Sequence, residues 1–377
     1  MKTAHMAAIA VMTACALSCG SPKDEGSPIT MLVGTYTDTG SKGIYSYRFD
    51  QNTGKLILPL TETAAEAPGS LSCAPLPNPS FLTITDDATV YAVGEMNGPT
   101  ASLSTLKFNR DDFSFELLST VLTGGEDPCY VATDGKIVLT ANYSGGSLSV
   151  YPIGENAKAG DPVQILKGDI GGPDLSRQNA AHVHCSIFSP DGKYVFATDF
   201  SADRILRFNA GKELSDMKAF PVHSDYGPRH IIFSNDGKNL YAIGELSGDI
   251  TVFGYNDGEL TEKQVIRADR VDARGAADIH MTPDGKFLYG SLRLQNDGIA
   301  IYKVLADGTL EDAGYCTTGI HPRNFAITPN GKFLLAACRD SNDIEVYSID
   351  GTTGALTPTG EKVTLPHPVC IAWDIVK

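Results

Sequence analysis

The sequence lacks the positive charge that nucleic-acid-binding proteins present to a phosphate backbone. Its 377 residues include 30 Lys and Arg against 45 Asp and Glu, which gives a formal net charge of −15. A nucleic-acid footprint needs a basic face, so this class of partner is disfavoured and none is expected. The remaining composition is ordinary for a folded chain, with 42% hydrophobic and 20% charged residues. Disorder, collagen-like structure and a coiled coil are therefore excluded as descriptions of the whole chain.

The sequence also lacks the motifs of several common catalytic classes. It contains no Gly-x-Ser-x-Gly, no His-Glu-x-x-His and no Gly-x-x-x-x-Gly-Lys-Ser/Thr, which argues against a serine hydrolase, a zincin and a phosphate-loop NTPase. Its cysteines are scattered and form no Cys-x-x-Cys pair, so neither a zinc knuckle nor a redox motif is indicated. We expect Cys129, Cys185 and Cys370, which lie in apolar strand-like segments, to be buried free thiols.

The first residues have the pattern of an export signal. Lys2 is followed by an apolar stretch from Ala7 to Leu17, which is too short to cross a bilayer because crossing takes about 20 residues. The small residues leading into Cys19 resemble a bacterial lipoprotein signal, in which Cys19 becomes the lipidated N-terminus. We therefore predict a signal peptide at 1–18, a polar tether at 19–29 and an exported lipoprotein, in the periplasm or at the outer membrane or cell surface. It would touch the membrane only through its lipid anchor; plain secretion is the alternative.

Four segments of the sequence repeat one pattern of short apolar strands joined by turns. The first turn of each contains Asp-Gly or Asn-Gly followed by Lys, and the turn glycines 192, 237, 285 and 331 are 45, 48 and 46 residues apart. Asp-Gly and Asn-Gly between apolar runs are the strongest short indication of a β-hairpin, because glycine adopts a positive φ without strain. The repeats are His182–Phe208, Gly227–Phe253, Ala276–Tyr302 and His321–Tyr347.

Weaker copies of this repeat extend it to the two ends of the chain. Two occur at Asn78–Leu106 and Asp127–Tyr151, a lone first strand lies at Pro368–Trp373, and Met31–Phe49 supplies a second and third strand without a first. Joining the two ends makes a seventh copy. A period of about 45 residues with several strands per copy is typical of a β-propeller. We predict an all-β, seven-bladed β-propeller at 30–377, a single domain closed by pairing of its N- and C-terminal strands, and we expect a monomer.

The repeat predicts where polar side chains gather. In each blade the first strand starts, and the second strand ends, at the same end of the ring, so residues at those places surround the mouth of the axis. The second-strand ends align as Glu95, Asn142, Asp199, Glu245, Arg293 and Arg339. We expect a polar pocket at the axis, and the residues predicted to bind substrate there are Arg323, Asn324, Asn142, Asp199 and His230.

His182 and His184 lie two residues apart in a predicted strand, so their side chains share one face. Either one can serve as an acid or base near neutral pH. A zinc ion would need a third protein ligand, and the spacing indicates none. The structural alternative is a histidine at the start of a strand that is bonded to a neighbouring carbonyl group. We expect no metal and no cofactor.

The dipeptide Pro-Arg occurs twice at the same blade position, ending at Arg229 and Arg323. Arginine holds a carboxylate or phosphate through two hydrogen bonds, so these residues and Arg293 are predicted to form an anion clamp. Glu245 beside such arginines would stay ionised and act as a base or position the arginines. Ion pairs between blades, to Glu245 or Asp199, are the structural alternative.

Seven short motifs are spread over nearly the whole chain after the tether: Val33–Thr37, Asn78–Leu82, Ala141–Ser147, Arg177–His184, Gly227–His230, Glu245–Leu246 and Pro322–Ala326. Together they resemble the lactonase family of seven-bladed propellers, which includes propeller-type 6-phosphogluconolactonases and 3-carboxymuconate lactonizing enzymes. The resemblance implies active-site residues at His184 or His182, Arg229, Glu245 and Arg293. Two positions depart from the family pattern, Tyr130 in place of a common histidine and Leu292 before Arg293, and both are expected at the pocket wall.

The resemblance implies a 6-phosphogluconolactonase-like hydrolase that opens a sugar-acid lactone without a metal. Arg229 and Arg293 would hold the phosphate or carboxylate and stabilise the oxyanion, and His184 or Glu245 would activate water. One alternative is a 3-carboxymuconate-type lactonizing enzyme, which would run similar chemistry in reverse. The other is a cell-surface propeller that binds acidic sugars without turning them over, because a fold alone does not decide function.

Overall fold

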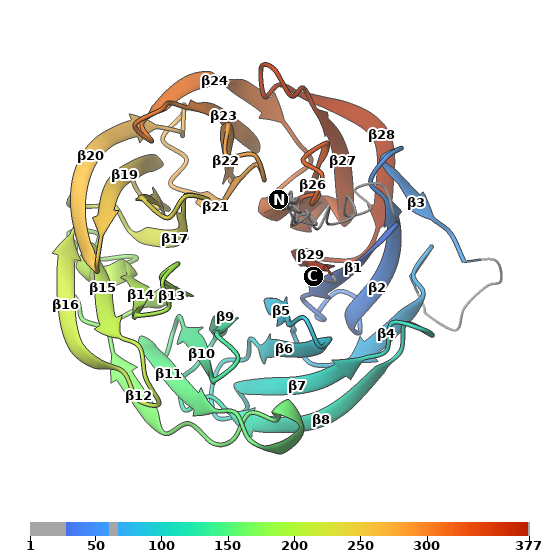
Figure 1. Ribbon diagram of the computed structural model, residues 1–377, viewed down its shortest axis with the longest axis horizontal. Coiled ribbons are helices and arrows are strands. Elements are labelled where there is room, and N and C mark those ends of the chain that lie inside the picture. The colour runs from blue at the N-terminus through green and yellow to red at the C-terminus, as the bar shows by residue number, and fades with distance from the viewer. Residues whose placement is uncertain (1–27, 60–66, 376–377) are drawn as a thin grey trace, which may run out of the picture.

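The computed structural model describes residues 28–59 and 67–375 of the chain. These residues form a ring of seven β-sheets around a central axis (Figure 1), which confirms the predicted all-β propeller of seven blades. The predicted signal peptide at 1–18 and the lipidated Cys19 lie outside the described residues. Strand β1 begins at Ile29, one residue before the predicted start of the propeller. In the described part of the chain no helix has the length and apolar character needed to span a membrane.

Each blade is an antiparallel sheet, and in six of the seven the strands run outward from the axis in chain order; the seventh has the order β29-β1-β2-β3, with β4 also paired to β2. The innermost strands are β5 (Leu82–Ile84), β9 (Pro128–Thr133), β13 (Val183–Phe188), β17 (Pro228–Phe233), β21 (Ala276–Met281), β25 (Pro322–Ile327) and β29 (Pro368–Asp374). The second strands are β6 (Thr89–Gly94), β10 (Ile137–Asn142), β14 (Tyr194–Asp199), β18 (Asn239–Gly244), β22 (Phe287–Leu292), β26 (Phe333–Cys338) and β1 (Ile29–Thr35).

The outer half of each blade consists of the third strand and an outer strand beyond it. The outer strands were not predicted from the sequence. The third strands are β7 (Ser102–Phe108), β11 (Ser147–Pro152), β15 (Arg204–Asn209), β19 (Asp249–Asn256), β23 (Gly298–Val304), β27 (Asp343–Ile349) and β2 (Gly43–Asp50). The outer strands are β8 (Phe115–Leu122), β12 (Gln164–Lys167), β16 (Ser215–Pro221), β20 (Glu259–Arg267), β24 (Leu310–Thr317), β28 (Leu356–Thr364), β3 (Lys55–Ile57) and β4 (Ser72–Pro75). Three short 3-10 helices complete the described elements: η1 (Glu155–Ala157), η2 (Phe200–Ala202) and η3 (Arg339–Ser341).

One blade joins the two ends of the sequence, as predicted. Strand β29 is its innermost strand and pairs antiparallel with β1, so that Leu32 lies opposite Ala372 and Val33 opposite Ile371. The end of β29 is fixed to the next blade because Arg110 donates to both oxygens of Asp374, with Nε 2.8 Å and Nη2 2.6 Å from their nearest acceptors. Closure covers the inner edge of β1, which would otherwise be open to pairing with other chains.

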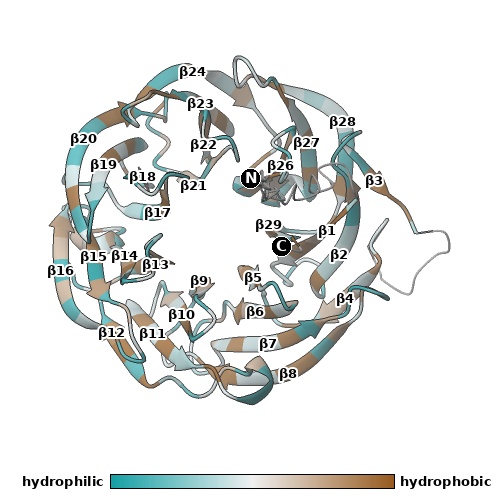
Figure 2. Cartoon of the chain, in the orientation of Figure 1, coloured by the Kyte–Doolittle hydropathy of each residue, from teal (hydrophilic) through white to brown (hydrophobic). Residues whose placement is uncertain are grey.

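The core is divided among the blade-to-blade contacts. Seven apolar clusters are found in the described chain, and each joins two neighbouring blades. The second strands are buried on both faces, as in β6 and β10, while the outer strands mix hydrophilic and hydrophobic residues (Figure 2). Cys129, Cys185 and Cys370 are buried free thiols, which confirms that prediction.

The repeated Asp-Gly-Lys turns are scaffold features, as their sequence indicates. Gly192 and Gly237 have φ of +68°, a conformation that glycine adopts without a steric penalty. In the first of these turns Asp191 Oδ1 accepts hydrogen bonds from the Ser189 hydroxyl at 2.6 Å and the Lys193 N–H at 3.1 Å. The equivalent bonds recur in the three following turns. The first and second strands of these blades are therefore joined in the same way.

Candidate active site

The blades present equivalent residues to the axis, and their pairing registers identify them. The first residue of an innermost strand pairs with the last residue of the second strand, as in Pro228 with Gly244 and Pro322 with Cys338. The ladder shifts register at the next residue, which places Arg229 and Arg323 at matching positions. A narrow recess lies here between the innermost strands, and it is lined by Ser80, Phe81, Cys129, Arg229, His230, Arg323, Asn324 and Val369.

Asn142 and Asp199 are not brought into this site, contrary to the sequence alignment of strand ends. They pair with Pro128 and Val183 as the last residues of β10 and β14. Asn142 Nδ2 donates to Ser149 Oγ at 2.9 Å within its own blade, and Asp199 Oδ2 accepts from Arg204 Nε at 2.9 Å. Because side chains alternate along a strand, the residue one step further is the one that turns toward the axis. The true equivalents of Glu245 are therefore Tyr143 and Phe200.

Glu245 follows β18 directly, and three arginines converge on its carboxylate. Its Oε2 lies 2.9 Å from Arg229 Nε and 3.2 Å from Arg293 Nη2, and its Oε1 lies 2.5 Å from Arg177 Nη2. The Arg229 contact is a close charge pair without hydrogen-bond geometry. The side chains of Glu245, Arg229 and Arg293 are 8%, 2% and 6% exposed. The structure thus brings together three of the residues selected from the sequence and adds a fourth.

The charges of this cluster determine what Glu245 can do. Burial alone would raise the pKa of Glu245, but Arg293, Arg229 and Arg177 outweigh it and lower the pKa to about 2. Such a weakly basic carboxylate is poorly matched to proton abstraction near neutral pH. Glu245 therefore fits the positioning role better than the base role. Backbone carbonyl groups complete the cluster, since Arg229 Nη1 donates to Ala277 O at 2.6 Å and Arg293 Nε to Gly275 O at 2.9 Å.

Arg177 is a site residue to which the sequence assigned no role. It lies in the loop between β12 and β13, outside the repeated strands, so the repeat cannot identify it. The loop is held in place by Arg274, whose Nη2 lies 2.7 Å from both Asp174 and Asp225. The Arg177 side chain is 35% exposed, far more than those of Arg229 and Arg293. It is therefore the guanidinium on Glu245 that a ligand can reach most readily.

The two candidate histidines occupy different environments. His182 is half-buried, its ring stacks on Tyr143 at 4.1 Å between centroids, and its Nδ1 lies 2.8 Å from the Tyr143 carbonyl oxygen. A carbonyl oxygen only accepts, so Nδ1 carries the proton and Nε2 carries the lone pair. Burial lowers the pKa of His182. His182 is therefore a neutral imidazole near pH 7, with a basic nitrogen that the Tyr143 bond leaves free.

His184 lies deeper, at the position equivalent to Arg229, and is 4% exposed. Its Nδ1 is buried without a hydrogen-bond partner among the described residues. Burial and the charge of Arg229 hold the pKa of His184 well below its ordinary value. The His184 side chain is therefore a weak base, and its unpaired Nδ1 lies in the neighbourhood of Arg229 and Arg323.

His230 and Asn324 line the recess but are held in a buried network. His230 Nδ1 lies 2.7 Å from Asp278 Oδ1, and Asn324 Nδ2 donates to Asp278 Oδ2 at 2.5 Å. Asn324 Oδ1 also accepts from the Ile371 N–H at 2.8 Å, which links β25 to β29. Burial, followed by the charge of Arg229, lowers the pKa of His230 to about 4. Both residues thus brace the recess through bonds that are already made.

The two departures from the family pattern lie behind the site. Tyr130 stacks on Phe81 at 4.2 Å between ring centroids and meets His230 edge-on at 5.3 Å. Leu292 is the last residue of β22 and packs in the apolar cluster between two blades. Among residues 28–59 and 67–375, no three or more His, Cys, Asp or Glu side chains gather as metal ligands would.

Arg323 forms a separate group with two residues from other blades. Its Nη2 lies 3.7 Å from Glu95 Oε1, and its guanidinium carbon lies 5.4 Å from the centre of the Tyr36 ring. Glu95 accepts hydrogen bonds from the Tyr36 hydroxyl at 2.8 Å and from the Ser80 hydroxyl. The strand alignment placed Glu95 at the mouth without giving it a role, and it did not identify Tyr36; both follow second strands directly, as Glu245 does.

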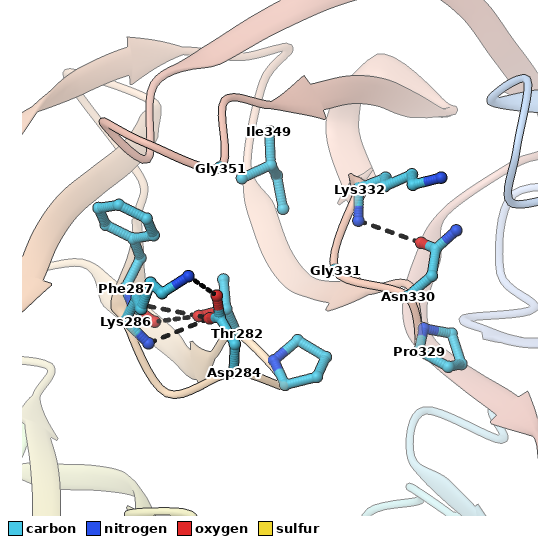
Figure 3. Close-up of a pocket in the computed structure, with 11 residues that line it drawn as sticks. Thr282, Asp284, Lys286, Phe287, Pro329, Asn330, Gly331, Lys332, Ile349 and Gly351 are labelled. Atoms are coloured by element: carbon cyan, nitrogen blue, oxygen red, sulfur yellow. Dashed lines mark hydrogen bonds and ion pairs between the residues drawn. The ribbon is translucent and has the colours of Figure 1, made fainter. Parts of the chain in front are cut away.

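A larger depression at the opposite, turn end of two blades has no comparable chemistry (Figure 3). Its polar side chains bond within the turns: Asp284 Oδ2 lies 2.9 Å from Lys286 Nζ, and Asn330 Oδ1 accepts from the Lys332 backbone N–H at 3.1 Å. The convergence of arginines on a carboxylate lies instead at the mouth of the axis.

The fold and this site define a known class of propeller. The sequence matches the family described as "Lactonase, 7-bladed beta-propeller" over residues 30–373, and the chain belongs to this family. It is 31% identical to the 6-phosphogluconolactonase of Bacillus subtilis, over 90% of this chain and 97% of the relative. It is 33% identical to the 6-phosphogluconolactonase of Formosa agariphila, over 86% of this chain and 94% of the relative.

Solved structures agree with this assignment. The periplasmic gluconolactonase of Pseudomonas aeruginosa is similar with a TM-score of 0.85 and 30% identity, over 93% of this chain and all (100%) of the other. A chain from Bacteroides uniformis is similar with a TM-score of 0.88 and 51% identity, over 92% of this chain and 99% of the other.

Proposed function

We propose that this protein is a lactone hydrolase that opens sugar-acid lactones of the gluconolactone and 6-phosphogluconolactone class. The observation that carries the proposal is a neutral His182 with a free Nε2 close to Arg177, which is held on Glu245 at the mouth of the propeller. The names of the relatives support the same substrate class.

In the proposed reaction His182 Nε2 takes a proton from water as the water oxygen attacks the lactone carbonyl carbon. The negative charge that develops on the carbonyl oxygen is stabilised by the arginine cluster, with Arg177 as its most accessible member. Fixed positive charge in a partly buried site stabilises such an oxyanion strongly. Collapse of the intermediate breaks the ring C–O bond, and the proton on His182 passes to the leaving alkoxide. The product is the open hydroxy acid.

The reaction is tested with the purified chain from residue 27 onward. Hydrolysis of 6-phosphoglucono-δ-lactone and glucono-δ-lactone is followed against the spontaneous rate, with and without a chelator. We expect acceleration of at least one lactone that persists in the chelator. The absence of acceleration on both lactones would contradict the proposal, and loss of activity in chelator would contradict its metal-independent form.

We also propose that the chain is an exported lipoprotein anchored through Cys19. The export pattern of residues 1–18 supports this, as does the periplasmic location stated for the Pseudomonas relative. In a bacterial host grown with labelled palmitate, we expect label in the wild-type protein and its recovery with membranes. Cys19→Ser should abolish both, because stable anchoring needs the lipid chains.

Cys15→Ser provides the matched control, since Cys15 lies within the predicted signal and should not be needed for lipidation. Label retained in Cys19→Ser would show that Cys19 is not the acylated residue. Wild-type protein without label that is recovered in the soluble fraction would favour plain secretion instead.

A further inference from the structure

The arginines around the axis differ in how completely their N–H groups are used. Arg229 and Arg293 contact Glu245 and donate to backbone carbonyl groups. Arg323 makes no hydrogen bond to any residue in the described part of the chain; its closest charge contact is the 3.7 Å approach to Glu95. A guanidinium carries five N–H donors, and those of Arg323, in a side chain that is 15% exposed, are paired with no acceptor in the described part of the chain. Arg323 is therefore the arginine that is free to bind a ligand.

The neighbours of Arg323 hold it without satisfying its donors. Tyr36 lies beneath the guanidinium, which supports its face by a cation–π contact and leaves its N–H edges open. Glu95 uses its two oxygens on the Tyr36 and Ser80 hydroxyl groups. The guanidinium edge is the part of arginine that binds phosphate or carboxylate through two parallel hydrogen bonds. The arrangement therefore presents a preorganised donor rather than a completed ion pair.

The charge around the recess favours an anion. Arg177, Arg229, Arg293 and Arg323 outnumber the three carboxylates around the recess, Glu245, Glu95 and Asp278, while the chain as a whole carries −15. A positive site with low-dielectric walls attracts an anionic ligand even when the rest of the surface repels it. The unpartnered Nδ1 of His184 is a second buried polar atom left open beside the recess.

We propose that Arg323, stacked on Tyr36 and braced by Glu95, binds an anionic substituent of the lactone and thereby selects anionic sugar lactones over neutral ones. The substituent is a phosphate ester or a carboxylate, which share this recognition chemistry. This inference rests on the proposed lactonase activity and adds the residue that determines substrate preference. The sequence suggested Arg229, Arg293 and Arg323 together as an anion clamp; in the structure Arg229 and Arg293 contact Glu245, which leaves Arg323 for the ligand.

The test compares kcat/KM of the full-length protein on three lactones that differ at C6. These are 6-phosphoglucono-δ-lactone, the corresponding lactone with a C6 carboxylate, and glucono-δ-lactone with a neutral hydroxyl group. For Arg323→Gln we expect kcat/KM on an anionic lactone to fall about 10- to 100-fold, which corresponds to the loss of one charged hydrogen bond. On the neutral lactone kcat/KM should change by less than about threefold. Loss on the phosphate alone assigns a phosphate subsite; loss on both anions assigns a general one.

Two further variants separate recognition from structure. Arg323→Lys retains the charge without the planar fork and should recover part of the preference. Arg270→Gln is the matched control, because Arg270 is 47% exposed and its Nη2 lies 3.3 Å from Asp312 of the outer strand β24. The Arg270→Gln protein should keep the wild-type preference for anionic lactones. An equal loss on all three lactones in Arg323→Gln would overturn the proposal, as would no loss on any.

Equilibrium binding separates this inference from the lactonase proposal. The open-chain products, 6-phosphogluconate and gluconate, are titrated into wild type and Arg323→Gln by calorimetry. Tighter binding of 6-phosphogluconate that is lost in the variant supports the subsite even if no lactone is hydrolysed. A wild-type protein that hydrolyses lactones but binds both products equally would overturn the subsite and leave the lactonase proposal standing.

Discussion

Replacing His182 with asparagine is expected to lower kcat for lactone hydrolysis by about 10²- to 10⁴-fold, the usual contribution of a general base. Asparagine retains an N–H that can donate to the Tyr143 carbonyl oxygen, which His182 Nδ1 contacts at 2.8 Å. It has no basic nitrogen to replace Nε2. Initial-rate kinetics with the spontaneous rate subtracted measure the effect, and the midpoint of thermal unfolding shows whether the fold is intact.

His223→Asn is the matched control for this experiment. His223 is 57% exposed and pairs with Glu262 on the outer surface, so its replacement should leave kcat within about twofold of the wild type, as expected for a surface change. A His182→Asn protein that folds and retains full activity would eliminate His182 as the base. The carboxylate of Glu245 would then have to be considered for that role.

The pH profile gives an independent check on the same residue. Burial lowers the pKa of His182 from its ordinary value of 6.5, against the raising effect of the bond to the Tyr143 carbonyl group. The base form is the unprotonated one, so kcat/KM should rise with pH through a pKa below 6.5 and be level near neutrality. The acidic limb should disappear in His182→Asn. An apparent pKa above 6.5 in the wild-type profile of kcat/KM against pH would contradict this interpretation.

Replacing Glu245 with glutamine is expected to lower the free energy of unfolding by about 3–5 kcal/mol, the cost of breaking a buried ion pair by removing one partner. Arg229 and Arg293 are almost fully buried and lose their shared counter-ion, while Arg177 loses the acceptor that holds its loop against the mouth. Urea unfolding at pH 7 measures the loss. Glu262→Gln is the control, because Glu262 is 44% exposed and its surface pair is worth less than about 1 kcal/mol.

The stability difference should depend on pH in a defined direction. The pKa of Glu245 is lowered from 4.5 to about 2 in the folded protein, where the three arginines overcome the effect of burial. A lowered folded-state pKa contributes stability that is complete above the unfolded pKa and is lost as the pH falls toward the folded one. The gap between wild type and Glu245→Gln should therefore be constant above about pH 5 and shrink between 4.5 and 2. If the difference in unfolding free energy stayed unchanged down to about pH 2, it would not arise from the charge of Glu245.

The fold could be predicted in detail because the turn chemistry repeats. Gly192 and Gly237 mark the same hairpin in two successive repeats. The strands that follow these glycines, β14 and β18, are so apolar that they can lie only inside a blade. The outer strands escaped prediction because they are half-exposed and polar, as in β20, and carry no repeated motif. Their position is determined by pairing with the third strand rather than by their own sequence.

The site was predicted where it follows the repeat and missed where it does not. Arg229, Arg293 and Glu245 stand at equivalent strand ends and do meet. Asn142 was misplaced by a single residue, which is enough to turn a side chain from the axis into the blade. Arg177 belongs to a loop whose path depends on ion pairs between distant segments, and such contacts leave no pattern along the sequence.

The pairing of β1 with β29 also has a consequence for how the protein matures. During synthesis β1 is made first, and one of its edges stays open until the partner strand from the far end of the sequence exists. Contacts between such distant segments form late, because the entropy of closing so long a loop is lost before the contacts compensate for it. The ring therefore cannot close until β29 has been synthesised. If the chain is exported as proposed, this late closure keeps the polypeptide unfolded while it crosses the membrane. The pairing of β1 with β29 then forms after export.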